Sequence, residues 1–522
     1  MKTLAIDFGN TNTVLAFRES SSREVQCIDL PGISEPGSVL IPSMIHYGDG
    51  QTLIGSQVIR EEKENSYNTF RWMKRYIGMN SPYHIRVNGE KISAKQAAEE
   101  FLSNLIRETE ERFAVHADEL VFSVPVESFE YYANWLISCF TIDGFRKVRI
   151  VDEAVSAAAG YGLKMHPGEP ALFFDFGGST MQATVVLLHE PNGREGFLPE
   201  SFQVIGKSGC SIGGSTVDRW IFEEALMQNR RDFSDPVIHR DGRIILAACE
   251  QLKERLSFFE EADLSLILTD HRKFTLRQSR EDLETLLRKR GLFQSVDAVV
   301  RDALLQAADH GIDASAITAV IPVGGGSMIP AIRSELENVL RKALILNGDP
   351  MTAVAKGAIN LIDGFGVLDF VRHQYAVRIR DGKTGEFRFH TIIQPGTPYP
   401  SDEPVTTLKI KATRQNQSLF GLAIYEISQP AFRPEAQTEI FFDEEGAIRL
   451  FSRADSEKEG EDTFWLNEHA PLFLHADPPA EKGIARFKAE FKVDRNKMLL
   501  ITVYDLSSGL CLFEDYPVIR LN

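Results

Sequence analysis

The stretch of sequence that decides the fold is LAIDFGNTNTVLAF, residues 4–17, in which an apolar run leads through Asp7 and Gly9 into a second β-rich run. A second stretch, LFFDFGGSTMQATVV at residues 172–186, repeats this order around Asp175. Each stretch predicts a β-hairpin whose tip carries one carboxylate, hydroxyl groups and backbone N–H groups made accessible by glycine. Two such tips far apart in one chain predict a duplicated fold with a nucleotide between its halves.

The residues of the two tips are candidate ligands for phosphate and for Mg²⁺. They are Asp7, Gly9, Asn10, Thr11 and Asn12 in the first tip, and Asp175, Gly177, Gly178, Ser179 and Thr180 in the second. Backbone turns of this kind bind phosphate, and we expect Asp7 and Asp175 to hold Mg²⁺ through water molecules. Thr11 and Thr180 are expected to contact phosphate. Each tip alone is also explained as a tight hairpin with a capping aspartate, and the coincidence of two tips favours nucleotide binding.

The composition is that of a soluble globular protein and argues against some classes of binding partner. The 522 residues include 25% charged residues and carry a net charge of −17. This acidic balance argues against nucleic-acid binding, because phosphate contacts need a basic face. The five cysteines show no metal spacing and fit a reducing compartment. No run approaches the ~18 apolar residues of a membrane span, and Asp7 interrupts the N-terminal apolar run, so we expect a cytoplasmic protein without membrane contact.

The predicted elements occur in the same order twice. The first half has strands at 2–8, 13–19 and 24–30, a helix at 93–113, and alternating strands and helices at 119–124, 127–142, 148–152 and 153–162. The second half has strands at 171–176, 181–188 and 201–206, helices from 215 and over 241–259, a strand at 264–269, a helical stretch at 281–310, a strand at 318–323 and a helix at 352–363. Three strands followed by α/β crossovers, occurring twice, are typical of the actin-like (ribonuclease-H-like) duplicated ATPase domain. We assign this α/β domain to residues 1–363.

The pattern changes after Gly364. Helical periodicity almost vanishes from residue 374 onward, and segments such as 407–412, 486–491 and 499–504 alternate between apolar and polar residues. This pattern predicts an all-β sandwich at 372–522, joined to the first domain by a linker at 364–371. The acid-rich stretch 443–462 is expected to be a solvated loop.

Two further segments carry candidate chemistry. Lys74 is the candidate cation beside the γ-phosphate, although a lysine on a polar helical face can also be merely solvated. Gly324, Gly325, Gly326 and Ser327 predict a strand-to-helix turn whose backbone lies against adenosine, or a glycine turn needed only for close packing. Residues 206–208 read Gly-Lys-Ser but do not form a P-loop, because Ser201 stands where the first glycine is needed.

With these motifs in place, the chain resembles the DnaK-type seventy-kilodalton heat-shock chaperone family over nearly its whole length. The two tips match the family's phosphate motifs, and Lys74 falls on its catalytic lysine. The resemblance implies that Glu153, in the first connecting motif, helps to position the water shell of Mg²⁺. It also implies an ATPase that converts ATP to ADP and phosphate. Further nucleotide contacts implied in this way are Gly213 and Gly214 after the second hairpin, and Glu250, Lys253 and Ser257 on the adenosine-contacting helix.

The resemblance extends to the β-domain and implies its partners. The family's sandwich holds an extended apolar peptide of an unfolded protein in a cleft. Ile410, Phe420 and Leu422 fall near its pocket positions, with plain sandwich core as the alternative. J-domain and nucleotide-exchange co-chaperones are further implied partners. No helical lid follows the last predicted strands, so we expect peptide to load and release quickly.

Departures from the family pattern leave alternatives open. Asn10 and Gln182 stand where the family usually has threonine and aspartate, and Ala154 replaces a proline linked to the family's allosteric switch. The first hypothesis is an ATP-dependent, lidless chaperone. The second is a nucleotide-binding scaffold or regulatory protein with weak or no hydrolysis. A sugar or carboxylate kinase of the same superfamily is disfavoured, because such an enzyme has no evident use for the C-terminal sandwich.

Overall fold

The structure is a computed structural model that describes residues 2–521, apart from 20–23, 49, 79–80, 82, 88, 114–115, 126–129, 142–146, 162–167, 190–199, 347, 363–364, 372, 381–383, 429–437, 443–447, 453–461, 469–470 and 495–496. The chain divides into two compact units. Unit 1 comprises Met1–Val367 and Ala431–Ser456, and unit 2 comprises Leu368–Pro430 and Glu457–Asn522. Within the described residues, every helix is too short or too polar to cross a membrane.

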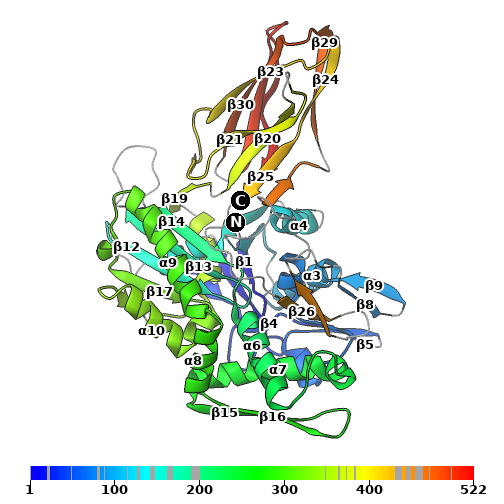
Figure 1. The fold of residues 1–522 in the computed structure, drawn as a ribbon, viewed down its shortest axis with the longest axis vertical. Coiled ribbons are helices and arrows are strands. Elements are labelled where there is room, and N and C mark those ends of the chain that lie inside the picture. Colours follow the sequence, from blue (N-terminus) through cyan, green and yellow to red (C-terminus); the bar gives the residue numbers. More distant parts are fainter. Residues whose placement is uncertain are drawn as a thin grey trace. The chain divides into compact units, whose positions relative to one another are not determined.

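The first half of unit 1 contains a mixed sheet built on the predicted hairpin at residues 4–17 (Figure 1). Its strands, in order, are β11 (Lys147–Asp152), β10 (Glu119–Val124), β1 (Lys2–Phe8), β2 (Asn12–Glu19) and β3 (Gln26–Cys27), with β4 (Leu40–Pro42) beside β2. β1 pairs antiparallel with β2 and in parallel with β10. The antiparallel register places Asp7 opposite Val14 and Phe8 opposite Thr13. The turn between these strands is therefore the predicted first tip.

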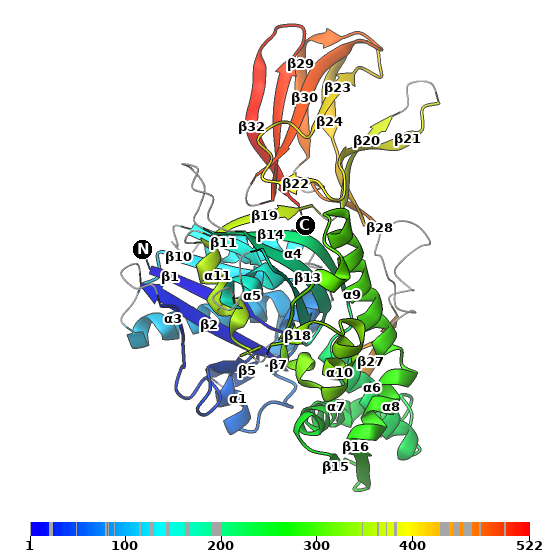
Figure 2. The ribbon, with the colours of Figure 1, turned by 90° about the vertical axis from the view of Figure 1, so that its left-hand side faces the viewer.

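The second half repeats this arrangement around the hairpin at residues 172–186 (Figure 2). Its strands, in order, are β18 (Leu344–Ile345), β17 (Ala319–Val323), β12 (Pro170–Phe176), β13 (Met181–His189), β14 (Glu200–Cys210) and β19 (Phe365–Phe370). β12 pairs antiparallel with β13 and in parallel with β17, as β1 does with β2 and β10. Asp175 lies opposite Gln182 in this register. The matching topology of the two sheets confirms the predicted duplication.

Helices surround the two sheets, and two of them cross at glycine. The helices described in unit 1 are α1 (Ser56–Arg60), α2 (Met73–Gly78), α3 (Ala94–Phe113), α4 (Glu130–Thr141), α5 (Glu153–Tyr161), α6 (Gly214–Gln228), α7 (Pro236–Phe258), α8 (Arg280–Lys289), α9 (Leu292–Asp309), α10 (Pro330–Val339) and α11 (Ala353–Ile362). A Cβ atom at Gly357 of α11 would lie 1.6 Å from the carbonyl oxygen of Ser156 in α5. A Cβ atom at Gly160 of α5 would lie 2.1 Å from the carbonyl oxygen of Ala353. Glycine therefore permits the backbones of the two helices to approach each other closely.

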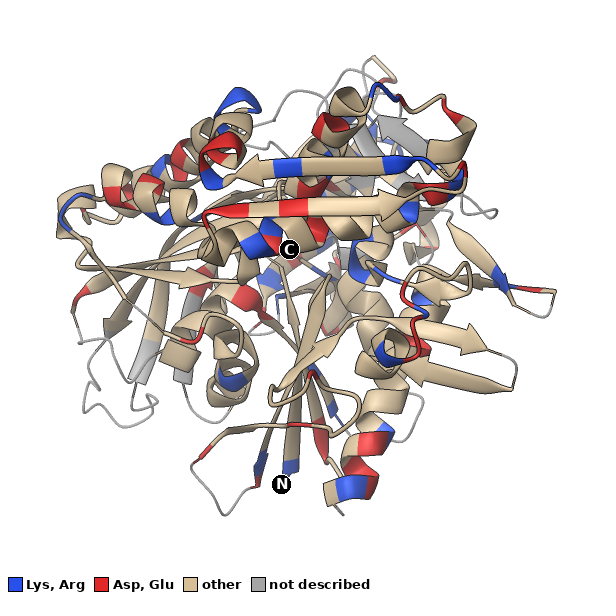
Figure 3. Ribbon diagram, turned by 90° about the horizontal axis from the view of Figure 1, so that it is seen from below, with Lys and Arg blue, Asp and Glu red and all other residues tan. Residues whose placement is uncertain are grey.

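Small sheets extend each half. They are β6 (Gln51–Ile54), β5 (Ile45–Gly48) and β7 (Thr69–Phe70) as one sheet, the pair β8 (His84–Val87) and β9 (Glu90–Ser93), and the pair β15 (Glu261–Ile267) and β16 (Lys273–Ser279). Figure 3 shows acidic residues along β15 and basic residues along β16. Asp263 and Arg277 are register partners across this pair, and the alternate residues Leu264 and Leu276 are buried. The alternation gives the hairpin one charged face and one core face.

Three parts of unit 1 differ from the sequence-based assignment. The strand expected at 264–269 is the first arm of the β15–β16 hairpin. The helical stretch expected at 281–310 is two helices, because Gly291 between α8 and α9 adopts φ +77°, a left-handed conformation that suits glycine. The expected solvated loop at 443–462 contains the strand β27 (Ile448–Ser452), whose Ile448 is buried.

Unit 2 is all-β, as the alternating sequence pattern indicates. One sheet has the order β21 (Phe387–Ile393), β20 (Gln374–Arg380), β25 (Ile424–Ser428) and β28 (Asp462–Trp465). A second has the order β23 (Thr406–Lys411), β30 (Ala485–Val493), β31 (Met498–Asp505) and β32 (Cys511–Arg520), and β24 (Gln417–Leu422) pairs with β29 (Leu472–Ala480). Alternate residues of the central strands, such as Phe487, Ala489 and Phe491, are fully buried in one apolar core.

The unit boundaries refine the expected domain limits. The predicted linker 364–371 holds strand β19, which follows β14 in the second sheet of unit 1 and pairs through Asp369 with Tyr399 of β22 (Pro398–Tyr399). The division between the units falls within this strand, between Val367 and Leu368. The described residues 438–442 and 448–452, expected to belong to the sandwich, group with unit 1, and Ile440 and Ile448 join its buried apolar cluster.

Candidate nucleotide site

The two predicted tips, 168 positions apart between Asn10 and Gly178, meet in unit 1. A Cβ atom at Gly178 would lie 3.2 Å from the Asn10 Cβ and 3.2 Å from the Thr11 Oγ1. Gly213 packs as tightly on the second tip, since a Cβ atom there would lie 2.5 Å from backbone atoms of Gly178. The N–H of Gly214 donates to the Gly177 carbonyl over 2.9 Å. The first tip, the second tip and the predicted glycine-glycine element therefore form one closely packed backbone cluster.

The predicted adenosine turn joins the same cluster from β17. Gly324 has φ +77°, and a Cβ atom there would lie 2.6 Å from the Asp175 Oδ1. A Cβ atom at Gly326 would lie 2.6 Å from the Phe176 carbonyl oxygen. The Ser327 hydroxyl donates to the Gly324 carbonyl over 2.7 Å and closes the turn. Glycine is needed here for close approach to the second tip, as the packing alternative requires, and the turn therefore lies beside Asp175 and Phe176.

Lys74 is held by Glu153. Its Nζ lies 2.6 Å from the Glu153 Oε1, and the two side chains are only 11% and 8% exposed. Glu153 is the first residue of α5, and the Asp152 carboxylate fixes the start of that helix by accepting the N–H groups of Ala154 and Val155. Burial alone would lower the pKa of Lys74, but Glu153, Tyr132 and Asp7 outweigh it and raise that pKa. Lys74 is therefore a charged ammonium group inside the site rather than a solvated surface lysine.

Three carboxylates surround this one cation. Burial raises the pKa of Asp7, against the opposing effects of Lys74 and of the Ser123 hydroxyl, which donates to the Asp7 Oδ1 over 2.7 Å. Burial also raises the pKa of Glu153 and of Asp175, and for Asp175 the charges of Glu153 and Asp7 add to the effect. Desolvated carboxylates in excess over cations are an environment that favours a bound divalent ion.

Among the described residues, no group of three His, Cys, Asp or Glu side chains is placed to hold a metal ion. One further observation fits a bound phosphate chain. The Asn10 Nδ2 and the Ser179 Oγ are buried and have no hydrogen-bond partner within the described structure. These donors, one on each tip, suit the oxygens of a phosphate chain, because a buried donor without a partner costs free energy.

Asn10 and Gln182, the two departures in the tips, are both buried and both hydrogen-bonded. The Asn10 Oδ1 accepts the backbone N–H of Arg75 over 3.1 Å. Gln182 is 1% exposed, and its Nε2 donates to the Thr180 Oγ1 over 3.3 Å. The Thr180 Oγ1 accepts this bond, so its O–H remains able to donate to a phosphate oxygen while Gln182 fixes the position of the hydroxyl.

The predicted adenosine helix is α7, and its three candidate residues are engaged differently. Lys253 Nζ lies 2.8 Å from the Asp218 Oδ1 and donates to the Gly214 carbonyl over 3.3 Å, so it lies at the cluster. The Glu250 Oε2 lies 2.6 Å from Arg71 Nη2 of the first half. The Ser257 hydroxyl donates to the Lys253 carbonyl over 3.4 Å, within its own helix.

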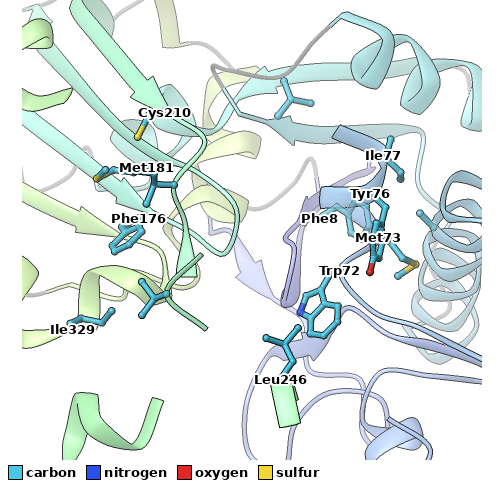
Figure 4. Packing of buried hydrophobic residues seen from close by; sticks show 14 of the residues in the cluster. Phe8, Trp72, Met73, Tyr76, Ile77, Phe176, Met181, Cys210, Leu246 and Ile329 are labelled. Carbon is cyan, nitrogen blue, oxygen red and sulfur yellow. The ribbon is translucent and has the colours of Figure 1, made fainter. Parts of the chain in front are cut away.

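Apolar packing accompanies the Arg71–Glu250 ion pair between the halves. Trp72 and Leu246 of α7 belong to one buried cluster, and Figure 4 shows their side chains pointing toward each other. The Arg71 guanidinium also lies 4.6 Å from the centre of the Trp72 ring. The first half thus contacts α7 through both charge and apolar area.

Four site residues were missed by the sequence analysis. No sequence motif around Arg71 or Ser123 marks them as site residues, because their partners Glu250 and Asp7 are 179 and 116 positions away in the chain. Asp218 follows the glycine-glycine element by four residues and could have been suspected as a partner for a lysine. Tyr132 of α4 is 2% exposed, and its hydroxyl is buried without a partner in the described structure. It interacts electrostatically with Lys74, Glu153 and Asp7 and so belongs to the site.

The three predicted peptide contacts lie in or on the core of unit 2. Phe420 and Leu422 are 4% and 3% exposed and belong to the buried cluster, whereas Ile410 is partly buried and packs against it. This burial favours the core alternative for Phe420 and Leu422. Leu419 and Phe473, on the adjacent strands β24 and β29, are instead 47% and 48% exposed.

Two opposed hairpin tips, a buried lysine–glutamate pair and an adenosine-type turn, built on two sheets of equal topology, define a duplicated actin-like ATPase domain. The family model for "Hsp70 protein" matches residues 3–371. The chain therefore belongs to the Hsp70 family, whose members are ATPases that bind ATP or ADP with Mg²⁺ and act as chaperones.

Individual relatives are distant. The protein named "Chaperone protein DnaK" of Deinococcus proteolyticus is 27% identical over 395 residues, which are 68% of this chain and 58% of the relative. The "Chaperone protein HscA homolog" of Bordetella petrii is 23% identical over 531 residues, 97% of this chain and 76% of the relative. The DnaK of Deinococcus deserti is 24% identical over 558 residues, 97% of this chain and 78% of the relative.

Proposed function

We propose that this protein is an ATP-dependent molecular chaperone that binds ATP between the halves of unit 1 and hydrolyses it to ADP and phosphate. The observation that carries the proposal is the Lys74–Glu153 pair beside the two opposed tips, with Asp7 and Asp175 at the same place. Phosphoryl transfer needs mainly positioning and charge stabilisation, and these residues supply both.

Each residue has a defined task in this proposal. The backbone N–H group of Gly178 and the hydroxyls of Thr11 and Thr180 hold the phosphates, while the Gly177 N–H closes the tip by donating to the Thr180 carbonyl. Lys74, kept charged by Glu153, orients the attacking water and stabilises charge that develops on the γ-phosphate. Bound Mg²⁺, held through waters by Asp7 and Asp175, would neutralise phosphate charge.

Adenosine is assigned to the space between α7 and the turn at 324–327. Lys253 and Glu250 approach it from α7, and the glycine backbone of the turn approaches from β17. The described contacts of Lys253 with Gly214 and of Gly324 with Asp175 support this placement, since they join both elements to the phosphate cluster.

For unit 2 we propose binding of extended apolar segments of unfolded proteins, with J-domain and exchange partners acting on unit 1. The exposed apolar side chains of Leu419 and Phe473 support an apolar ligand. Ile410 remains a candidate contact, and the protein is proposed to act in the cytoplasm.

The proposal is tested by single-turnover hydrolysis of ATP in the Lys74→Ala variant. We expect hydrolysis to be lost while ATP still binds, because the tips and the adenosine elements are unchanged. Hydrolysis at the wild-type rate would refute the assignment of Lys74. Steady-state hydrolysis with and without an unfolded apolar peptide tests the coupling, and stimulation by the peptide is the expected result.

A nucleotide-binding scaffold with weak hydrolysis is the second candidate function. The specific observation in its favour is Gln182, which is buried opposite Asp175 and engages Thr180 with an amide rather than offering a carboxylate. A missing carboxylate near the metal's water shell weakens metal binding or slows turnover.

A further inference from the structure

A hairpin that is inserted in unit 2 by sequence is part of unit 1 by structure. Strands β26 (Thr438–Phe442) and β27 pair antiparallel, with Ile440 opposite Leu450 and Phe442 opposite Ile448. In the chain they lie between β25 and β28, which are paired neighbours in a sheet of unit 2. The segment Ala431–Ser456 nevertheless groups with unit 1. The two tips are formed by other strands, and β25 and β28 pair directly with each other in the sandwich.

The hairpin is docked by buried apolar side chains. Ile440 and Ile448 are 6% and 3% exposed and belong to the buried cluster of unit 1. The register and the two-residue period of a strand place both on one face of the hairpin. β27 packs on α7, and Figures 1 and 2 both show the hairpin beside α6 and α7. An isolated two-stranded hairpin is marginally stable in water, so this contact with α7 holds it in place.

The helix that receives the hairpin also carries nucleotide contacts and joins the two halves. Arg243 of α7 is 7% exposed and donates to the Ser66 carbonyl over 2.6 Å and to the Tyr83 hydroxyl over 2.8 Å, both in the first half. Glu250 of α7 pairs with Arg71 in the first half, and Lys253 reaches the Gly214 carbonyl. A change in the position of α7 would disturb all of these bonds together.

We propose that the β26–β27 hairpin is a docking element that holds α7 in its nucleotide-binding position, so that hairpin docking and nucleotide affinity are coupled. The inference rests on the proposed nucleotide site. Coupling between two sites is reciprocal: if docking strengthens ADP binding, ADP strengthens docking by the same factor.

The experiment compares ADP affinity and release in full-length variants. Ile440→Asp and Ile448→Asp place a charge in the buried contact, and a third variant replaces residues 431–456 with a short glycine–serine segment that introduces no buried charge. Ile267→Asp is the matched control, because Ile267 lies on β15 of unit 1 and is 69% exposed. Binding is measured with a fluorescent ADP analogue. Hydrogen exchange of residues 438–442 and 448–452 in the wild type is measured with and without ADP.

We expect the three hairpin variants to bind ADP about tenfold more weakly, and to release it faster, with Ile267→Asp unchanged; tenfold corresponds to ~1.4 kcal/mol. In the wild type, ADP should slow exchange in both strands of the hairpin. If the wild type binds ADP and all variants match it, the docking inference is overturned while the proposed function stands. If the wild type binds no adenine nucleotide, the proposed function itself is refuted.

Discussion

Nζ of Lys74 lies 2.6 Å from the Oε1 of Glu153, although 79 positions separate them in the chain. Lys74 belongs to α2 of the first half, and Glu153 opens α5, which crosses α11 at Gly160 and Gly357. The proposed catalytic lysine is thus paired with the first residue of a helix whose own position is set by close packing against α11.

The first prediction concerns this pair. Glu153→Gln removes the charge that keeps Lys74 ionised and oriented, and it also removes one of three buried carboxylates. We expect the rate of single-turnover hydrolysis to fall by about 100-fold, the scale of a lost electrostatic contact in an active site. ATP affinity should change much less, because the tips are not altered. The measurement is ATP hydrolysis under single-turnover conditions, and a variant with wild-type rates would show that Glu153 has no part in the chemistry.

The second prediction separates an enzyme from a scaffold. Gln182→Asp restores a carboxylate opposite Asp175 and frees the Thr180 hydroxyl from the amide of Gln182. If the protein is a scaffold that lost turnover at this position, hydrolysis should rise by about tenfold or more and require less Mg²⁺. If it is an efficient ATPase already, the rate should not rise. Titration of hydrolysis against Mg²⁺ in both proteins decides between the two.

The third prediction tests the crossing of α5 and α11. Gly357→Ala would place a Cβ atom 1.6 Å from the Ser156 carbonyl oxygen, and neither backbone can yield without moving its helix. We expect a loss of at least ~1–3 kcal/mol in the free energy of unfolding, the range for overpacked cores. Gly78→Ala is the control, because a Cβ atom there meets nothing within 4 Å. Urea unfolding of both variants provides the comparison, and equal stabilities would contradict the packing described here.

The fourth prediction is a pH dependence in unit 2. Arg486 and Asp505 form a buried ion pair of 2.7 Å, with side chains 5% and 6% exposed. Burial acts to raise the pKa of Asp505, but the N–H groups of Ser507 and Ser508 and the charge of Arg486 outweigh it and lower that pKa. The resulting stabilisation is present above the ordinary aspartate pKa of about 3.9 and is lost as pH falls through the lowered value.

Asp505→Asn should therefore destabilise unit 2 at pH 7 by ~3–5 kcal/mol, since it leaves a buried guanidinium without its carboxylate. The difference from wild type should shrink below about pH 4. Asp515→Asn is the matched control, because its ion pair with Lys492 spans 3.9 Å and its side chain is 53% exposed. Urea unfolding at pH 7 and pH 3 tests this, and a difference that is equally large at both pH values would contradict it.

Local patterns in the sequence were enough for the duplicated sheets and for both tips. The turn chemistry around Gly9 and Gly177 and the two-residue period of the strands are encoded within a few residues, and the structure confirms the hairpins. Arg71 could not be found in this way, because its role depends on Glu250 in the other half. The same limit applies to residues 443–462: their acidic composition indicated a solvated loop, whereas Ile448 within this stretch joins the buried apolar cluster of unit 1.

The chain passes between the two units at residues 367–368, 430–431 and 456–457. A single proteolytic cut at the first passage therefore cannot release an intact unit 1, because part of its buried cluster remains on the other fragment. A fragment ending at Val367 would uncover the apolar area of unit 1 that Ile440 and Ile448 bury, and a fragment beginning at Leu368 would carry those residues with nothing to bury them. Unit 1 is therefore complete only when the chain includes both Met1–Val367 and Ala431–Ser456, which flank the first segment of unit 2.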